Sequence, residues 1–332
     1  MSDTATEILA PETLDSFDRL RGDCALLVPE DLSVIEVRGE DRKGWLQGQA
    51  TNDLKQLDLG ASHSFCFCTP TGQLLAICDI WGLRDRFILT CEKAVTQAVL
   101  TRFDQMVVLE DVQVKDITSE HTMLSVQGPN ATRELQDLVI LPTLDAADSR
   151  GGDREVVTLR SNRAGLGGWD LLIPKGDTKT PKDIRKRFTA VQPEAYEIAR
   201  IEAGIPIFGR DWDSKTLPPE LGPAFETRHI SYRKGCYTGQ EVLMRLHSRG
   251  HTNRTWVALM SEHPLTAGCL VSHSRRKDAG AVTSACYSPD YGYIAGAMLR
   301  NEAVLEGDWV TVDGPDGPVQ AEVRHMPILR FD

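Results

Sequence analysis

Residues 234–241 read KGCYTGQE, and the helix-like run VLMRLHSRG follows directly. Two glycines, Gly235 and Gly239, enclose Cys-Tyr-Thr and permit backbone angles that other residues avoid. The apolar spacing of QEVLMRLHSR predicts a helix, so Cys236 is expected in a loop just before a helix N-terminus and beside Lys234. Both neighbours favour the thiolate and would lower the pKa of Cys236. The pattern is typical of a nucleophile, a redox thiol or a soft-metal ligand, and the residues leave these three open.

The segment around this motif is basic, although the chain is acidic. The 332 residues carry a formal net charge of −11, yet six Lys and Arg side chains lie between positions 227 and 254 with a single carboxylate, Glu241. The negative charge of the whole chain argues against direct nucleic-acid binding, while contact with tRNA remains an alternative. The six cations are Arg228, Arg233, Lys234, Arg245, Arg249 and Arg254.

Composition predicts an ordinary globular protein of two or three domains. Hydrophobic residues make up 41% and charged residues 26% of the chain. The N-terminus, MSDTATEILAPETLDSF, has neither the basic start nor the apolar core of a signal peptide, and no long apolar run follows. We therefore expect a cytoplasmic protein that does not enter a membrane.

The eight cysteines show no C-x-x-C spacing. Cys66 and Cys68 alternate with Phe65 and Phe67, a strand-like pattern that favours core packing over metal binding. Cys236 alone cannot complete a metal site. If it binds iron or a cluster, the other ligands must come from a partner or a small molecule.

The rest of the chain predicts alternating strands and helices. DAADSRGGD (145–153) is interpreted as a loop, and Asn130 as the N-cap of a helix over NATRELQDLV. From Trp256 onward, short strands between turn signals predict a β-barrel or sandwich. Expected strands are LSVIEVRG, SFCFCTP, QLLAICDIW, RFILTC, VKDITSEHTMLSVQGP and the hairpin TLRSNRAGLGGWDLLIP; expected helices lie near residues 12–20, 40–54, 93–107, 177–191 and 194–204.

KGCYTGQE resembles the signature of the YgfZ family of folate-binding proteins, whose mitochondrial relatives help mature iron–sulfur enzymes. RGEDRKGWLQGQATNDL (38–54), TPTGQLLA (69–76), SVQGPNA (125–131) and RIEAGIP (200–206) also have counterparts in that family, in the same order. The resemblance spans roughly residues 30–250.

The resemblance implies an α+β fold similar to the T-protein aminomethyltransferase of glycine cleavage, a three-lobed ring that holds tetrahydrofolate in a central channel. It implies a folate-binding region over residues 1–250, built from two interleaved subdomains and carrying KGCYTGQE, and a C-terminal β-barrel over residues 251–332. A ring that closes on itself is expected to be a monomer.

The resemblance also implies roles for single residues. Glu202 matches the glutamate that binds the pterin, and Tyr196 lies where some members place a tryptophan against the folate. Cys236 and Lys234 are expected to be the working residues, with Cys236 as a possible shared iron–sulfur ligand. Arg200, Tyr237, Gln240 and Arg245 complete the expected folate-binding set; Gln240 is also expected to hold the loop, and Tyr237 either packs or forms a lid.

The leading expectation is a tetrahydrofolate-binding accessory protein for iron–sulfur cluster assembly or repair, including maturation of tRNA-modifying enzymes. Its partners would be an A-type cluster carrier or client enzymes, and a transient cluster would be shared with them. The alternative is a folate-dependent one-carbon transferase or demethylase. The transferase aspartate falls at Ala76 or Ile77 here, and Asp79 is the displaced candidate for its role.

Overall fold

The chain forms two compact units in the computed structural model, which describes residues 3–151, 154–303 and 305–329. Segments far apart in sequence build each unit. The first unit contains Met1–Asp18, Val191–Glu226 and Arg245–Asp332, and the second contains Arg19–Ala190 and Thr227–Met244.

Two five-stranded sheets form the second unit, and neighbouring strands in both are antiparallel. One sheet has the order β1 (Ala25–Leu27), β7 (His121–Gln127), β10 (Gly168–Pro174), β9 (Arg154–Ser161) and β8 (Ala146–Gly151). The other has the order β3 (Ser62–Cys68), β4 (Leu74–Gly82), β5 (Phe87–Glu92), β2 (Leu32–Arg38) and β6 (Gln113–Asp116).

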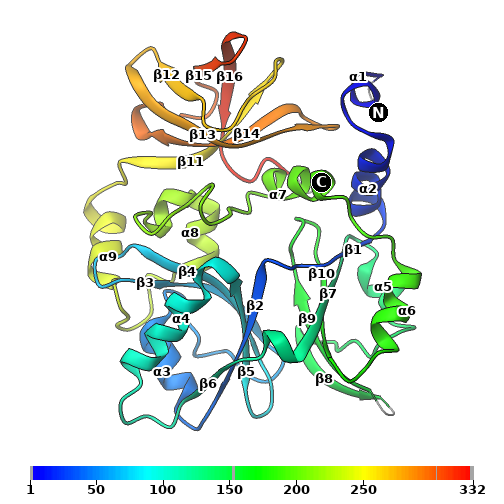
Figure 1. Ribbon diagram of the computed structural model, residues 1–332. Coiled ribbons are helices and arrows are strands. Elements are labelled where there is room, and N and C mark those ends of the chain that lie inside the picture. The colour runs from blue at the N-terminus through cyan, green and yellow to red at the C-terminus, as the bar shows by residue number, and fades with distance from the viewer. Residues whose placement is uncertain (1–2, 152–153, 304, 330–332) are drawn as a thin grey trace. The chain divides into compact units, whose positions relative to one another are not determined.

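The two sheets pack face to face in this unit and share one apolar cluster. Val34 and Trp81 of one sheet contact Val157 and Leu172 of the other, and all four are buried. Helices cover the outer faces, as Figure 1 shows: α3 and α4 lie against the sheet of β2 to β6, and α5 and α6 against the other. These helices are α3 (Arg42–Gln49), α4 (Lys93–Met106), α5 (Ala131–Leu135) and α6 (Thr180–Arg187).

Aromatic side chains fix α3 and α4 on their sheet. Trp45 of α3 stacks on Phe103 of α4 with 4.6 Å between ring centroids, and Phe67 of β3 meets Phe103 edge to face. Burial alternates along β4, where Ala76 and Cys78 are buried and Ile77 between them is half-buried. This period of two is that of a β-strand, as expected for QLLAICDIW.

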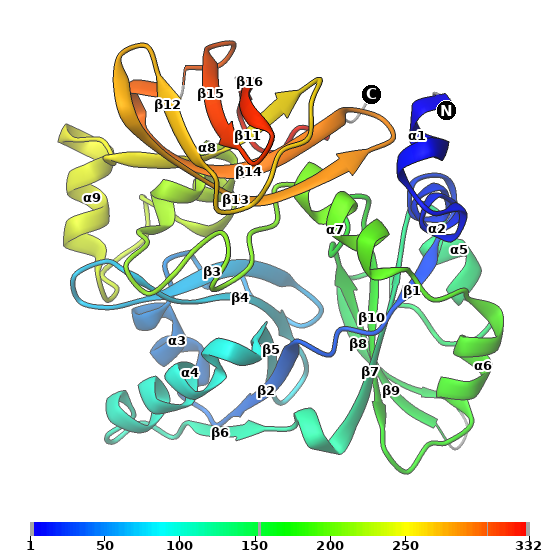
Figure 2. The same cartoon turned by 45° about the horizontal axis from the view of Figure 1, so that its top comes forward.

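A closed six-stranded barrel dominates the first unit, which confirms the barrel alternative of the sequence prediction. Figure 2 shows its strands with α7 beside β13. The order is β11 (Arg254–Ser261), β14 (Gly292–Arg300), β13 (Arg276–Ser288), β12 (Leu270–His273), β15 (Trp309–Gly314) and β16 (Gly317–Arg324). Its helices include α1 (Asp3–Ile8), α7 (Pro193–Glu202) and η2 (Pro218–Leu221), while α2 (Pro11–Gly22), α8 (Pro223–His229) and α9 (Gln240–Arg249) cross the border between units.

One local prediction was wrong, and a second was right in position but not in contact. Residues 146–151 are not a loop, because β8 pairs with β9 from Ala146↔Leu159 to Gly151↔Arg154; the rest of the predicted loop, 152–153, lies outside the described residues. The sequence did not predict this strand because its residues are small and polar and lack an alternating apolar face. The strand forms through its hydrogen bonds to β9. Asn130 occupies the N-cap position of α5, but its side chain donates to Asp23 Oδ1 at 3.1 Å and does not cap the helix.

Candidate functional site

Lys234 anchors the KGCYTGQE loop to the end of α3. Its Nζ atom donates to the carbonyl oxygens of Gln47, Ala50 and Asn52 at 2.7, 2.5 and 2.9 Å. An ammonium has three N–H donors, so all three are used on backbone carbonyls at a helix C-terminus, where a positive charge is favourable. Burial lowers the pKa of Lys234 to about 8.

This arrangement differs from the one expected for Lys234. The sequence suggested an ammonium that favours the thiolate of Cys236. Its three donors instead satisfy the carbonyl groups of Gln47 and Ala50 at the end of α3 and of Asn52 just after it. Lys234 is therefore a positioning residue for the loop.

Tyr237 provides the second anchor of the loop. It is 6% exposed, and its ring lies 5.0 Å from Lys234 Nζ. The hydroxyl is buried and has no hydrogen-bond partner among the described residues, and burial raises its pKa. Within this unit Tyr237 is a packing residue, which was one of the two roles considered for it.

Gly239 is the position in the loop where only glycine fits. Its φ is +84°, and an added Cβ would lie 2.6 Å from the carbonyl oxygen of Thr69. Gly235 has neither a positive φ nor a close neighbour, so the expectation of special geometry holds for one of the two glycines. Gln240 closes the loop from its end, since its backbone N–H donates to Tyr237 O at 3.2 Å and its Nε2 to Lys234 O at 3.5 Å.

Cys236 is the one exposed thiol among the chain's eight, all of which lie in described residues. Cys66 and Cys68 are fully buried, which confirms the core-packing interpretation. The described residues contain no group of three or more His, Cys, Asp or Glu side chains that could hold a metal ion. That a metal at Cys236 takes its other ligands from a partner or a small molecule stays a prediction.

A polar cluster that sequence reasoning largely missed surrounds Asp79 on β4 in the same unit. Asp79 accepts a hydrogen bond from Ser64 at 2.6 Å, and the guanidiniums of Arg163 and Arg228 lie 3.8 and 3.7 Å from its carboxylate. Burial alone would raise the pKa of Asp79, but Arg228, Arg163 and Ser64 together hold it below its ordinary value. The side chain is 30% exposed.

Arg163 connects this cluster to the other sheet of the unit. It pairs with the fully buried Asp170 at 2.6 Å and donates to Thr90 at 3.2 Å. Asp170 also accepts from Ser125 and Ser161 at 2.7 and 2.8 Å. The sequence offered no signal for this pairing, because the two arginines lie far from Asp79 along the chain.

The residues expected to bind the pterin lie on α7, in the first unit. Glu202 is fully buried and accepts a hydrogen bond from Ser288 Oγ at 2.6 Å. Tyr196 is half-buried near the start of the helix. These two keep the role that the resemblance gave them only as a prediction.

Arg200, also on α7, has another task. Its guanidinium is fully buried, and its five N–H groups meet Glu197 twice, Asp211 at 2.7 Å, Ser284 at 2.7 Å and the carbonyl of Ile205 at 3.2 Å. With every donor used, Arg200 joins α7 to the loop after it and to β13. It offers no N–H to a ligand.

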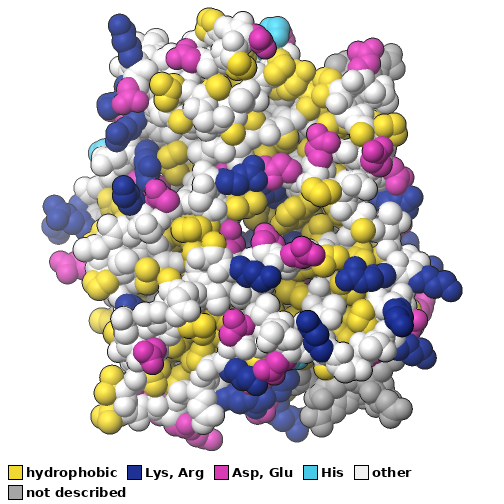
Figure 3. Space-filling model, viewed as in Figure 1, with side chains coloured by type: hydrophobic (Ala, Val, Ile, Leu, Met, Phe, Trp, Pro, Cys, Tyr) yellow, Lys and Arg dark blue, Asp and Glu magenta, His cyan; other side chains and the backbone are white. Residues whose placement is uncertain are grey.

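The remaining cations of the basic segment divide into two groups. Arg254 pairs with Glu220 at 3.1 Å, and Arg228 faces Asp79. Arg233, Arg245 and Arg249 are exposed. Figure 3 shows one face of the molecule, on which basic and acidic side chains are interspersed.

This architecture is that of an aminomethyltransferase. The aminomethyltransferase T of the glycine cleavage system from Bartonella henselae superposes with a TM-score of 0.83 over 97% of this chain and 91% of that one, at 20% identity. The profile of the GCVT N-terminal domain matches residues 10–228, and the chain belongs to that family. The predicted fold class, T-protein-like with mixed α/β content and a C-terminal barrel, is confirmed.

Relatives with full-length similarity carry transferase names. An aminomethyltransferase of Listeria monocytogenes is 25% identical over 94% of this chain and 88% of its own length. A chloroplastic protein of Arabidopsis thaliana, named for a proposed transferase activity, is 24% identical over 95% of this chain and 73% of its own. Among the described helices, none has the length and apolarity required to cross a membrane.

Proposed function

We propose that this protein binds a reduced folate and uses Cys236 in the assembly or repair of iron–sulfur clusters. The observation that carries the proposal is the KGCYTGQE loop, which presents a single exposed thiol while Lys234 and Tyr237 fix the loop from within. A rigid loop holds a thiol in one place without lowering its access to solvent or to a partner.

The folate part of the proposal follows from the family. Aminomethyltransferases of this family use tetrahydrofolate, and the resemblance places Glu202 against the pterin. The fit is supported by the donor set: Glu202 is a buried carboxylate held by Ser288, and a fixed carboxylate suits the paired N–H groups of a pterin. Tyr196 would contact an aromatic ring of the folate, and the exposed Arg245 is left for its carboxylate tail.

The cluster is cargo in this proposal and not a resident cofactor. The Cys236 thiolate would supply one ligand, and a carrier protein or client enzyme would supply the rest, because one thiol cannot hold a cluster alone. Effects on tRNA-modifying enzymes would then be indirect. We propose further that the protein is cytoplasmic and monomeric.

Separate variants distinguish the two parts. Cys236→Ala should bind tetrahydrofolate with unchanged affinity and lose the ability to support cluster transfer. Glu202→Gln should weaken tetrahydrofolate binding at least tenfold in isothermal titration calorimetry, with Glu194→Gln as a matched change at an exposed position of the same helix. Equal loss of both properties in folded Cys236→Ala would refute this division of roles.

A folate-dependent one-carbon transferase or demethylase is the second candidate, and the Asp79 cluster favours it. An aspartate between two arginines stays ionised, so it can orient a cationic or N–H-bearing group but is a weak proton acceptor. Turnover of an N-methyl or aminomethyl substrate with tetrahydrofolate, lost in Asp79→Asn, would establish this activity.

A further inference from the structure

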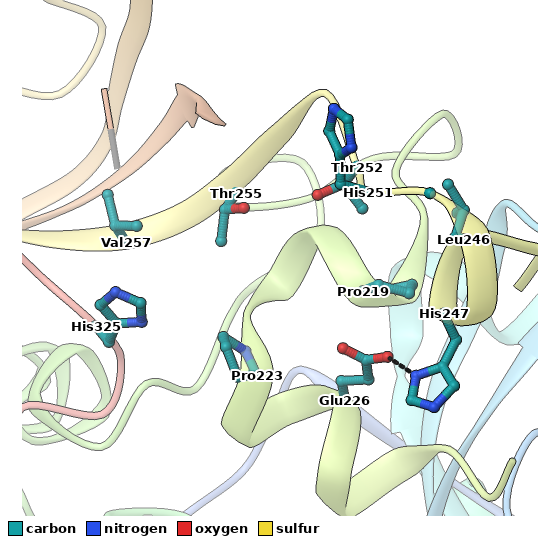
Figure 4. Close-up of a pocket in the computed structure, with 11 residues that line it drawn as sticks. Pro219, Pro223, Glu226, Leu246, His247, His251, Thr252, Thr255, Val257 and His325 are labelled. Atoms are coloured by element: carbon teal, nitrogen blue, oxygen red, sulfur yellow. Dashed lines mark ion pairs between the residues drawn. The ribbon is translucent and has the colours of Figure 1, made fainter. Parts of the chain in front are cut away.

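A cavity of about 300 Å³ lies within the first unit, between η2 and α8 on one side and the end of α9 and start of β11 on the other (Figure 4). Pro219, Pro223, Leu246 and Val257 supply its apolar walls. A cavity of this volume is at the lower end of the range for ligand sites and holds one bulky side chain. The proposed roles of the folate and of Cys236 assign no function to this cavity.

Arginines flank the wall made by α9 and β11, although none of them lines the cavity itself. Residues 245–255, RLHSRGHTNRT, contain three arginines and no carboxylate. Arg254 is neutralised by Glu220 at 3.1 Å. Arg249 is exposed on the last turn of α9 without an ion pair in the described parts of the chain. His251, which lines the cavity, is exposed as well.

The opposite wall carries one carboxylate, and it is already engaged. Glu226 Oε1 lies 3.6 Å from His247 Nδ1, the contact drawn as a dashed line in Figure 4. The carboxylates of Glu220 and Glu226 therefore face Arg254 and His247, and Arg249 is left without a counter-charge in the described parts of the chain. Complementary charge at this place is negative.

We propose that this cavity docks an acidic segment of a partner protein. A bulky apolar side chain of that segment fills the cavity, and carboxylates beside it face Arg249 and His251. In such contacts an apolar side chain buried in a pocket usually supplies most of the binding energy, and charges surround it at the rim. A single-stranded RNA fits less well, because no Phe, Tyr or Trp lines the cavity for base stacking and the chain has a net charge of −11.

Three peptides test the proposal with the whole ¹⁵N-labelled protein by NMR titration: acetyl-Glu-Asp-Phe-Glu-Asp-amide, its Phe→Ser counterpart, and acetyl-Lys-Arg-Phe-Lys-Arg-amide. The first should bind at least tenfold more tightly than the other two and shift the signals of Leu246 and Thr255. Equal affinities, no shifts at these residues, or tighter binding of a uridine hexanucleotide would overturn the proposal.

Variants locate the contact. His251→Glu should weaken binding of the acidic Phe peptide at least tenfold, whereas His263→Glu, the same change at an exposed position outside the cavity, should leave it within twofold. Leu246→Asp should act like His251→Glu. If His251→Glu and His263→Glu behave alike, the cavity is not the docking site, and the role of Cys236 in cluster chemistry is unaffected.

Discussion

The Nζ atom of Lys234 lies 2.5 Å from the carbonyl oxygen of Ala50, the C-cap residue of α3. This contact joins the segment of residues 234–241 to a helix nearly two hundred positions earlier in the chain. Because the ammonium also meets the carbonyls of Gln47 and Asn52, it replaces the donors that a helix end lacks. The loop that presents Cys236 is thus fixed to the end of α3, and the two should unfold together.

Replacing this ammonium should destabilise the protein. Lys234→Met keeps the aliphatic stem but leaves three buried carbonyls without their donor, and we expect a loss of about 3 kcal/mol in the free energy of unfolding. Urea denaturation measures it. Lys55→Met, at an exposed neighbouring position, should change stability by less than about 0.5 kcal/mol; equal effects of the two changes would contradict the anchoring role.

The same residue predicts a pH dependence. The pKa of Lys234 is about 8 in the folded protein against 10.5 ordinarily, so between these values the unfolded chain binds more protons than the folded chain. Stability contributed by this group therefore rises with pH. Wild type should gain about 2 kcal/mol relative to Lys234→Met between pH 7 and pH 9.5. A constant difference across that range would show that the pKa is not lowered.

The unpartnered hydroxyl of Tyr237 predicts an unusual substitution. Tyr237→Phe removes a buried polar group that has no partner in the described structure, so stability should stay the same or rise by about 1 kcal/mol. Tyr237→Ala should cost about 4 kcal/mol, because it also empties the packing site. A marked loss in Tyr237→Phe would mean that the hydroxyl has a partner in solution, which thermal unfolding of the two variants would reveal.

The charge network at α7 predicts a difference between two arginines that share Glu197. Arg200 is fully buried and pairs with the buried Asp211, whereas the Arg210 side chain is 44% exposed. Arg200→Met leaves the buried Asp211 carboxylate without its counter-charge and should lower the free energy of unfolding by about 4 kcal/mol. Arg210→Met should cost less than about 1 kcal/mol. Similar losses, measured by urea denaturation, would argue against a structural role for Arg200.

Much of the fold was predictable because local patterns and tertiary packing agree. Strand β4 and helix α4 appear in the structure where the sequence predicted them. Strand β8 was not predicted, because AADSRG has no apolar alternation and its hydrogen bonds are made with β9. The way distant segments combine into the two units also cannot be predicted from amino-acid composition.

The candidate site was predictable in part. The burial of Cys66 and Cys68 follows from their alternation with Phe65 and Phe67, whereas the exposure of Cys236 could not be predicted from its motif. The contacts of Lys234 with α3 and of Arg163 with Asp170 could not be predicted either, because hydrogen bonds between distant segments have no sequence period. A basic flank is consistent with either a counter-ion for a thiolate or a structural anchor, and only the positions of the carbonyl groups distinguish them.

The most direct test of the central claim is anaerobic reconstitution. The purified protein is mixed with an A-type cluster carrier, iron and sulfide, and visible absorption is recorded for wild type, Cys236→Ala and the buried-thiol control Cys24→Ala, with and without tetrahydrofolate. We predict a chromophore and a stable complex in wild type and Cys24→Ala, and neither in Cys236→Ala. A chromophore of equal intensity in Cys236→Ala, or none in any sample that still binds tetrahydrofolate, would contradict the assignment of Cys236 to cluster chemistry.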